Sequence, residues 1–359
     1  MNPPRVFLKR VAQHASATAW KQAVQDVLEA SEALRLVRKR DLVAVKLHVG
    51  EPGVKTMLPP DVAAGVVSCL RTRGARPFLT DSAVLYASPR ANGAEHAEVA
   101  DRHGFTLERT GAVFLPADGL EGNLERTVAI AGKHFREVGI ATTIADADGL
   151  VVLSHATGHL ASSYGGTLKN LGMGCASRKG KLLQHSDTKP RIRRERCEAC
   201  GACSDACPED AIDQDEEGIA AIAVERCIGC GECIAHCRSD AVGFSWDTAS
   251  AKMQEKMVEH ALGVLRLAPA RIAYVLGLVN LTKDCDCLSP GSAIVARDIG
   301  FAASSDPVAL DQAAMDLVRR RETKSLAELA YPGLDATVQL AYAERLGLGS
   351  RHYELEELP

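Results

Sequence analysis

The chain has 359 residues, 46% of them hydrophobic, which is enough to bury one large core or two modest ones. Its formal net charge of -4 excludes a chain-wide electrostatic attraction to nucleic acid or to an anionic membrane. No apolar run approaches the roughly 18 residues of a membrane span, and the start, MNPPRVFLKRVAQ, lacks the apolar core of a signal peptide. We therefore expect a cytoplasmic globular protein that binds neither nucleic acid nor membrane.

Short apolar runs alternate along the chain with longer segments of helical period. Strands are predicted at residues 5–11, 41–50, 76–81 and 148–156, and helices at 17–37 and 59–74. The pattern resumes further on with a helix at 248–267, a strand at 271–281, a helix at 306–321 and a terminal helical region at 325–349. This alternation predicts an α/β fold with a mostly parallel sheet and helices on both faces.

A charge run, TKPRIRRER at residues 188–196, precedes an abrupt change to cysteine-rich sequence. We place a domain boundary there. The predicted organisation is an α/β domain in two parts, 1–190 and 246–359, interrupted by a small α+β module at 191–245. The last part carries the terminal helices.

The cysteine-rich module contains an internal repeat, CEACGACSDACPEDAI followed by CIGCGECIAHCRSDAV. Each half has the spacing C-x2-C-x2-C-x3-C, in which three thiolates hold one cluster and the fourth crosses to the other. The repeat therefore predicts two [4Fe-4S] clusters. One would be held by Cys197, Cys200, Cys203 and Cys237, and the other by Cys227, Cys230, Cys233 and Cys207.

A pair of structural zinc sites is the alternative, because thiolate groups also suit zinc. Zinc modules usually separate two C-x2-C pairs by a longer spacer, whereas this duplicated run of four resembles bacterial-type two-cluster ferredoxins. Pro208 matches that pattern and Arg238 replaces its second proline. Two neighbouring clusters form a short electron wire, which implies a redox partner protein or a small-molecule electron donor.

Three polar segments follow predicted strands, where open α/β sheets bind ligands. They are KLHVGEPG, SHATGHLASSYGGTLKNLGMGCASRKGKLLQH and NLTKDCDC. We expect them to converge at one crevice that binds an unknown small-molecule substrate. The catalytic candidates are Lys46, His48, Glu51, His159, Lys169 and Asn170.

Further residues of these segments are candidates for binding a cofactor or a metal. Gly165 and Gly166 would let the backbone approach a ligand or form an anion-binding nest, and Lys169 offers a positive charge or a nucleophilic amine. Lys179 and Lys181 are expected to be solvated. An additional metal or metal-containing cofactor could use some of the soft ligands Cys175, His185, Cys285 and Cys287.

The chain resembles the domain-of-unknown-function 362 family of iron–sulfur proteins. The residues that carry the resemblance are KLHVGE, GHLASSYGGTLKNLGMGCASRKGKLLQH, the double cysteine motif, CDC, DIG at 298–300 and SDPVALDQA at 305–313. Because these motifs span most of the chain, the resemblance implies the fold and the clusters. It implies no particular reaction.

The middle segment is also similar to the N-terminal domain of the nickel-pincer lactate racemase family, which has a histidine, a Gly-Gly-x-Lys and a further histidine. His159, the sequence GGTLK ending at Lys169, and His185 keep that order, with one residue inserted before the lysine. The resemblance implies an acid/base role for His159, cofactor attachment at Lys169 and metal ligation by His185. That family has no ferredoxin module, so the similarity covers the α/β part only.

Three functions compete. In the first, an oxidoreductase, the clusters pass electrons to a redox site in the α/β crevice. The second is a ferredoxin-like carrier without catalysis of its own, and the third is a racemase- or isomerase-like enzyme with regulatory clusters. The sequence lacks a G-x-G-x-x-G after a strand and a G-x-x-x-x-G-K-[ST], which disfavours nicotinamide, flavin and P-loop nucleotide chemistry.

Overall fold

The computed structural model describes residues 3–185, 189–227, 229, 231–243, 248–267, 271–288 and 292–359. Its centre is an eight-stranded sheet in the order β16-β1-β15-β14-β7-β2-β3-β4. β15 pairs antiparallel with β1 and β14, and the other neighbours pair in parallel, as the alternating pattern predicts. The strands are β1 (Arg5–Arg10), β2 (Leu42–Lys46), β3 (Arg76–Asp81), β4 (Phe114–Pro116), β7 (Gly149–His155), β14 (Ile272–Leu278), β15 (Gly300–Ser304) and β16 (Glu354–Glu357).

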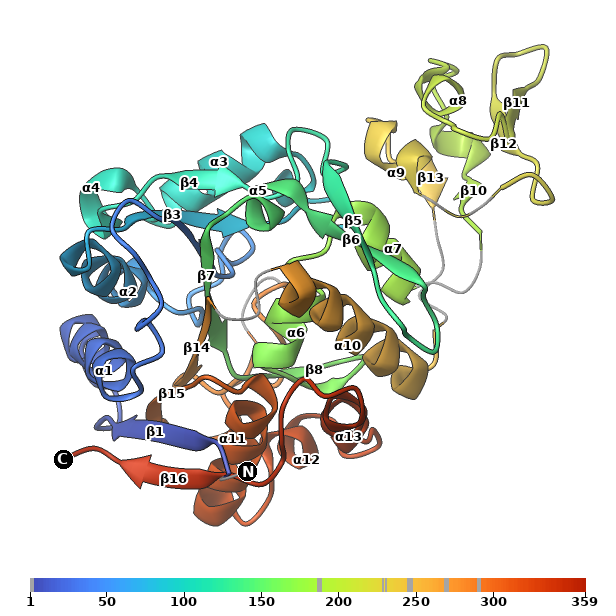
Figure 1. Cartoon of the computed structure of the whole chain (residues 1–359). Helices are drawn as coiled ribbons and strands as arrows, with labels where there is room; N and C mark the ends of the chain where they lie inside the picture. Colours follow the sequence, from blue (N-terminus) through green and yellow to red (C-terminus); the bar gives the residue numbers. More distant parts are fainter. Residues whose placement is uncertain are drawn as a thin grey trace.

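Helices cover both faces of this sheet (Figure 1). Side chains alternate along a strand, so β14 sends Tyr274 and Leu276 into one core and Ala273 and Val275 into the other. One core is shared with α1 (Ala17–Ala30), α2 (Pro60–Thr72) and α3 (Gly93–Arg102). The other is shared with α6 (Thr167–Gly172), α10 (Ser250–Leu267), α11 (Pro307–Glu322), α12 (Leu326–Ala330) and α13 (Thr337–Arg345).

The long helices begin at side-chain caps. Ser16 accepts the Ala19 amide at the start of α1, and Asp306 accepts two amides at the start of α11. α1 ends at Ala30, before the predicted end at residue 37. Just beyond the helix, Glu32 adopts a φ of 51°, which is incompatible with a continuing α-helix. Within the described ranges, no helix is long and apolar enough to cross a membrane. The remaining elements of this part are α4 (Leu107–Thr110), α5 (Thr142–Ala145), α7 (Arg178–His185), a 3-10 turn (Pro89–Ala91), and two ribbons, β5 (Glu125–Ala129) with β6 (Glu137–Ala141) and β8 (Thr157–His159) with β9 (Ser163–Gly165).

The predicted strands at 5–11, 41–50, 76–81, 148–156 and 271–281 are confirmed as β1, β2, β3, β7 and β14. Three strands of this sheet escaped prediction. β4 is only three residues long, and β15 lies between β14 and α11. β16 is a short charged edge strand, ELEE, that lacks an apolar pattern and follows the region predicted to be helical. Because β16 pairs with β1, both ends of the chain lie at the same edge of the sheet (Figure 1).

The cysteine-rich segment, residues 189–243, lies at one corner of the molecule, with α9 among the parts nearest the main sheet (Figure 1). It is built from short elements: β10 (Arg191–Ile192), a 3-10 turn (Arg194–Arg196), α8 (Ala202–Asp205), β11 (Ile212–Gln214), β12 (Ala220–Ile222), α9 (Glu232–His236) and β13 (Val242–Gly243). The domain boundaries at 190 and 245 stay a prediction.

Candidate functional site

A cavity of about 550 Å³ opens beyond the carboxyl ends of β2, β3 and β7, within the size range of ligand pockets. The last residues of those strands, Lys46, Asp81 and His155, all line it. All three polar segments singled out from the sequence therefore reach one cavity. Their predicted residues in its wall are Lys46, His48, His159, Gly165, Gly166, Lys169, Asn170, His185, Cys285 and Cys287.

A buried network of charges forms the floor of the cavity. Lys46 Nζ lies 2.9 Å from Asp81 Oδ1 and donates to Asn170 Oδ1 at 2.7 Å. Arg90 binds Asp81 and Glu51, each at 2.8 Å. Burial alone would raise the pKa of Asp81, but Lys46 and Arg90 together hold it well below its usual value. The polar groups of Lys46, Glu51 and Asn170 are already paired within this network, so these residues shape the cavity. Glu51 does not line it.

Sequence reasoning missed several members of this network. Asp81 ends a predicted strand, a signal that could have identified it. Arg90 and Tyr86 lie in a loop segment without a recognisable motif. The Tyr86 hydroxyl donates to Glu51 Oε1 at 2.7 Å and lies 2.9 Å from the Cys287 carbonyl oxygen, which ties the first polar segment to the third.

Lys169 projects from α6 into the cavity. Within the described part of the chain, its amine makes no hydrogen bond or ion pair. Burial lowers its pKa to about 8, although Asp286 opposes the shift. A side chain at Gly165 would place its Cβ 2.9 Å from Lys169 Cδ, so the absence of one leaves the lysine room. Lys169 is therefore a cation that a ligand could neutralise.

Two histidines of the wall are neutral. Nδ1 of His48 accepts the Gly50 amide at 3.0 Å, and Nδ1 of His159 accepts the Ser162 amide at 3.1 Å. Burial lowers both pKa values well below 6.5, helped by the charge of Arg90 at His48 and of Lys169 at His159. With Nδ1 accepting, Nε2 carries the proton of each neutral ring and is the nitrogen left for a ligand.

Asp286, between the two cysteines of CDC, contributes an unpaired carboxylate oxygen. Its Oδ2 lies 2.8 Å from His155 Nδ1, whose Nε2 contacts the Val279 carbonyl oxygen at 2.7 Å. Oδ1 is buried and has no hydrogen-bond partner among the described residues. A buried polar atom without a partner is rare and calls for a ligand, an ion or a water molecule. Sequence reasoning noted Asp286 only as the residue between the cysteines.

The glycine pair does not form a free anion-binding nest. The Asp311 carboxylate accepts the amides of Thr167 and Leu168 at 2.7 and 2.8 Å, so the first amides of α6 are occupied. At Gly166 a Cβ would lie 2.4 Å from Asp311 Oδ1. This corrects the expected role of Gly166, whose small size makes room for Asp311. Gly165 lines the cavity beside Lys169.

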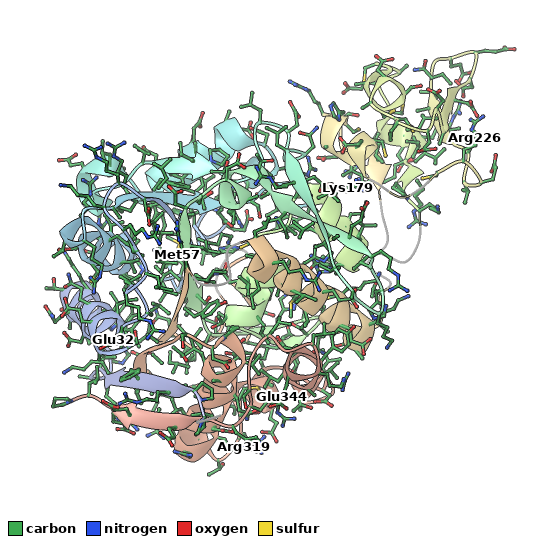
Figure 2. The ribbon with its side chains drawn as sticks, viewed as in Figure 1. Glu32, Met57, Lys179, Arg226, Arg319 and Glu344 are labelled. Atoms are coloured by element: carbon green, nitrogen blue, oxygen red, sulfur yellow. A yellow bond between two sulfur atoms is a disulfide. The ribbon has the colours of Figure 1, made fainter. Side chains whose placement is uncertain are left out.

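The expectation that Lys179 and Lys181 are both solvated is wrong for Lys181. Lys179, on α7, lies near the protein surface (Figure 2) and pairs with Glu125. Lys181 is buried in the cavity wall, where its amine donates to the Ala83 and Ala176 carbonyl oxygens. One helical turn thus presents one lysine outward and the other inward.

The soft ligands meet in a different combination from the one expected. Cys285 and Cys287 are joined by a disulfide, and their sulfurs lie within 4.8 Å of a ring nitrogen of His159. Cys175 is buried outside the cavity, where burial raises its pKa to about 12. His185 lines the cavity with its Nε2 3.2 Å from Met173 Sδ, apart from the two-cysteine group.

The cysteines of the cysteine-rich segment line two small cavities. Cys197, Cys200, Cys203 and Cys237 line the first, and Cys207, Cys227 and Cys233 line the second. Cys230 lies outside the described residues. Among the described residues, the first cavity combines three cysteines of the first repeat with the fourth cysteine of the second, and the second combines two cysteines of the second repeat with the fourth of the first. This arrangement agrees with the crossing rule.

The two halves of the segment share their backbone details at an offset of 30 residues. Positive φ values recur at Ala199 and Gly229, Gly201 and Gly231, and Asp210 and Asp240. The Ala211 amide lies 3.3 Å from Cys207 Sγ, and the Ala241 amide lies 3.2 Å from Cys237 Sγ. Amide donors aimed at cysteine sulfurs are a recurring feature around iron–sulfur clusters.

The sulfurs of the first cavity are not gathered as closely as a single zinc ion requires. A tetrahedral zinc site holds its sulfurs about 3.8 Å apart, because each lies about 2.3 Å from the metal. Among the described residues, only His159, Cys285 and Cys287 place three possible metal ligands within 4.8 Å of one another. The cysteines of the first cavity do not form such a group. The four sulfurs around the first cavity are therefore spread more widely than zinc requires.

The second half of the segment docks on the main domain through α7. Leu182 packs against Gly231, where a Cβ would lie 2.7 Å from Leu182 Cδ2. Leu85, Leu182, Cys233 and Ile234 share one hydrophobic cluster. At the edge, Asn123 donates to Glu232 at 3.3 Å. Leu85 also lines the large cavity, so one residue joins the two sites.

Fold and site together define an α/β protein with a cavity beyond its parallel strands, in which a mostly apolar wall carries a few charged and polar side chains. A two-repeat cysteine-rich segment lies beside it. The chain belongs to the family described as Domain of unknown function (DUF362), which matches residues 43–316. This confirms the resemblance seen in the sequence. No curated protein matches the chain.

The chain is similar to two solved structures. The lactate racemase apoprotein from Thermoanaerobacterium thermosaccharolyticum is 12% identical, with a TM-score of 0.39, over 76% of this chain and 50% of that chain. A structural-genomics target protein from Thermotoga maritima is 10% identical, with a TM-score of 0.44, over 89% of this chain and 60% of that chain. This chain thus spans half to three fifths of their lengths.

Proposed function

We propose that the protein is an iron–sulfur oxidoreductase that binds two [4Fe-4S] clusters and uses their electrons in the large cavity. The observation that carries the proposal is the sorting of cysteines into two cavities, each lined by sulfurs from both repeats. A cluster at Cys197, Cys200, Cys203 and Cys237 and another at Cys207, Cys227, Cys230 and Cys233 would follow. When bound, such clusters supply single electrons at low potential.

The two cysteine cavities differ in their surroundings, which supports a direction for the electrons. The first includes the exposed Cys200, where a redox partner protein or a small electron donor could approach. The second borders α7 through Gly231 and Leu182. The same helix carries Lys181 and His185 in the wall of the large cavity. Electrons would enter at the first position and leave at the second.

The wall of the large cavity supports a small polar substrate. Among the residues that the structure describes, Lys169 offers a cation without a hydrogen-bond partner, and Asp286 Oδ1 offers an acceptor without a donor. The two charges influence each other's pKa without forming an ion pair. A substrate with a carbonyl or carboxylate group for Lys169 and a hydroxyl or amino group for Asp286 would satisfy both. His48, held neutral, would exchange protons with it through Nε2.

The test is the reoxidation of reduced protein. Anaerobic protein, reduced with a stoichiometric viologen radical, is mixed with a panel of small 2-oxo acids and aldehydes while the visible absorption of the clusters is followed. A substrate should speed reoxidation, and Lys169→Ala should remove at least 90% of that acceleration. Lys179→Ala is the matched control, because this lysine pairs with Glu125 near the protein surface.

The competing functions give different results in the same experiment. A pure electron carrier would reoxidise equally fast in the wild type and in Lys169→Ala with any acceptor. A racemase or isomerase would interconvert a substrate at one rate whether the clusters were oxidised or reduced. Either result would contradict the proposed oxidoreductase.

A further inference from the structure

The wall of the large cavity contains a group of donor atoms that the proposed function leaves unused. Cys285, Cys287 and His159 each offer one ligand atom within 4.8 Å of the others. The two cysteines are joined as a disulfide, in which form their sulfurs are not thiolate ligands. These three residues therefore define two states of one site. In the oxidised state the cysteines form a disulfide without metal, and in the reduced state they offer two thiolates beside an imidazole.

We propose that Cys285 and Cys287 are the electron acceptor of the cavity, and that their reduction creates a site for a divalent transition metal with His159 as the third ligand. The inference rests on the proposed function, because the electrons are those of its iron–sulfur centres. Two thiolates and one imidazole suit zinc and the neighbouring first-row ions. The remaining coordination position would face the cavity.

The surroundings of His159 favour metal binding. Its Nδ1 accepts the Ser162 amide at 3.1 Å and contacts the Ser162 hydroxyl at 2.9 Å, which fixes the ring. Because Nδ1 accepts the Ser162 amide, Nε2 carries the proton of the buried ring and is the atom left for a metal. Nε2 would release that proton when the metal binds, since ligand atoms must be deprotonated.

Asp286 supplies an independent indication. Its Oδ1 is buried in the same wall without a partner among the described residues, and Asp286 as a whole is 5% exposed. An uncompensated carboxylate oxygen of this kind is stabilised by a nearby cation. A divalent ion between the flanking cysteines and His159 would provide one, whether or not the carboxylate coordinates it.

The contacts of Leu85 and Tyr86 connect this pair to the cysteine-rich segment. Leu85 packs in the same cluster as Cys233 and Leu182. The hydroxyl of the next residue, Tyr86, lies 2.9 Å from the Cys287 carbonyl oxygen. Two consecutive residues thus span from the second cysteine cavity to the Cys285–Cys287 pair.

The chemistry balances with two electrons and two protons. The S–S bond breaks, each sulfur takes up one electron and one proton, and two thiols form. Binding of a divalent ion then forms two sulfur–metal bonds and one bond to Nε2 of His159, and releases three protons, two from the thiols and one from Nε2. Oxidation of the pair reverses both steps and expels the ion.

The experiment counts electrons in anaerobic protein purified without thiols. Titration with viologen radical should deliver four electrons per wild-type chain, one to each cluster and two to the disulfide. The double variant Cys285→Ser/Cys287→Ser should take up two. Cys69→Ser, which removes a buried cysteine of α2, is the matched control and should keep four.

Two further readouts use the same samples. Iodoacetamide should add two groups to the Cys285–Cys287 peptide only after reduction, as measured by mass spectrometry. Co²⁺ added to reduced protein should produce a thiolate-to-cobalt charge-transfer band that is missing from oxidised protein. His159→Ala should still take up four electrons but bind Co²⁺ at least about tenfold more weakly. Loss of a residue that merely hydrogen-bonds to a metal ligand already weakens metal affinity about tenfold or more.

Uptake of two electrons by the wild type, with no change in labelling, would overturn the inference even if iron and sulfide are present. A failure of the proposed function would show separately, as the absence of iron and acid-labile sulfide. A charge-transfer band that is equally strong before and after reduction would also overturn the inference, because metal binding would then be independent of the disulfide.

Discussion

Lys46 Nζ and Asp81 Oδ1 lie 2.9 Å apart at the ends of adjacent parallel strands, and both side chains are almost completely buried. The other oxygen of Asp81 binds Arg90 at 2.8 Å. One carboxylate therefore balances two buried cations directly beneath the candidate site.

Replacing Asp81 with asparagine should destabilise the fold strongly. The change removes the counter-charge of the buried Lys46 and leaves Arg90 with Glu51 alone, and breaking such a buried pair costs about 3 to 5 kcal/mol. Urea unfolding under anaerobic conditions measures the loss. Asp146→Asn is the control, because Asp146 pairs with Arg126 at the surface and should cost less than about 1 kcal/mol. Equal effects of the two changes would contradict the assigned network.

The difference between the wild type and Asp81→Asn should depend on pH. The folded pKa of Asp81 lies well below its unfolded value of about 3.9, because Lys46 and Arg90 outweigh the effect of burial. A depressed folded pKa gives stability that is complete above the unfolded value and is lost as the pH falls toward the folded one. The free-energy difference should therefore be constant from pH 7 to about pH 5 and shrink below pH 4. A difference that persists unchanged at pH 3 would argue against this linkage.

Gly172→Ala should displace α6, which carries Lys169. A Cβ at residue 172 would lie 2.1 Å from the Met257 carbonyl oxygen of α10, so the two helices would have to separate. Overpacking of this kind costs about 1 to 3 kcal/mol. Gly333→Ala, at a position with nothing within 4 Å, should change stability by less than about 0.5 kcal/mol. Thermal unfolding of the two variants side by side measures this difference. Unfolding midpoints that are the same for both variants would contradict the α6–α10 contact.

The amine of Lys169 should react at unusually low pH. Burial lowers its pKa to about 8, compared with about 10.4 for an ordinary lysine. Trace labelling with acetic anhydride, quantified by peptide mass spectrometry across pH, should give a midpoint near 8. Asp286→Asn should move the midpoint lower still, because the Asp286 charge favours the ammonium form. A midpoint near 10 in the wild type would show that the amine is solvated.

Patterns that depend on local order could be read from the sequence. Parallel strands end at one edge of a sheet, so His48, Lys169 and Cys285, which follow three strands, could be expected in one cavity. The duplicated cysteine spacing likewise predicted which sulfurs share a cavity, including the crossing of Cys207 and Cys237.

Relations set by tertiary packing could not be predicted in this way. Arg90 reaches Asp81 and Glu51 from a loop whose sequence has no motif. Cys175 was grouped with the cavity ligands because it lies near Lys169 in the sequence, yet it is buried outside the cavity. His159 joins Cys285 and Cys287 across more than a hundred residues, a pairing that spacing alone does not contain.

The most direct test of the account is the metal and acid-labile sulfide content of anaerobically purified protein, measured together with its EPR spectrum after reduction. Two [4Fe-4S] clusters require roughly eight irons and eight sulfides per chain and a cubane signal. Cys237→Ser should lose the same half of this content as Cys203→Ser, since both cysteines line the first cavity. Two zinc ions per chain with no sulfide would contradict the central claim.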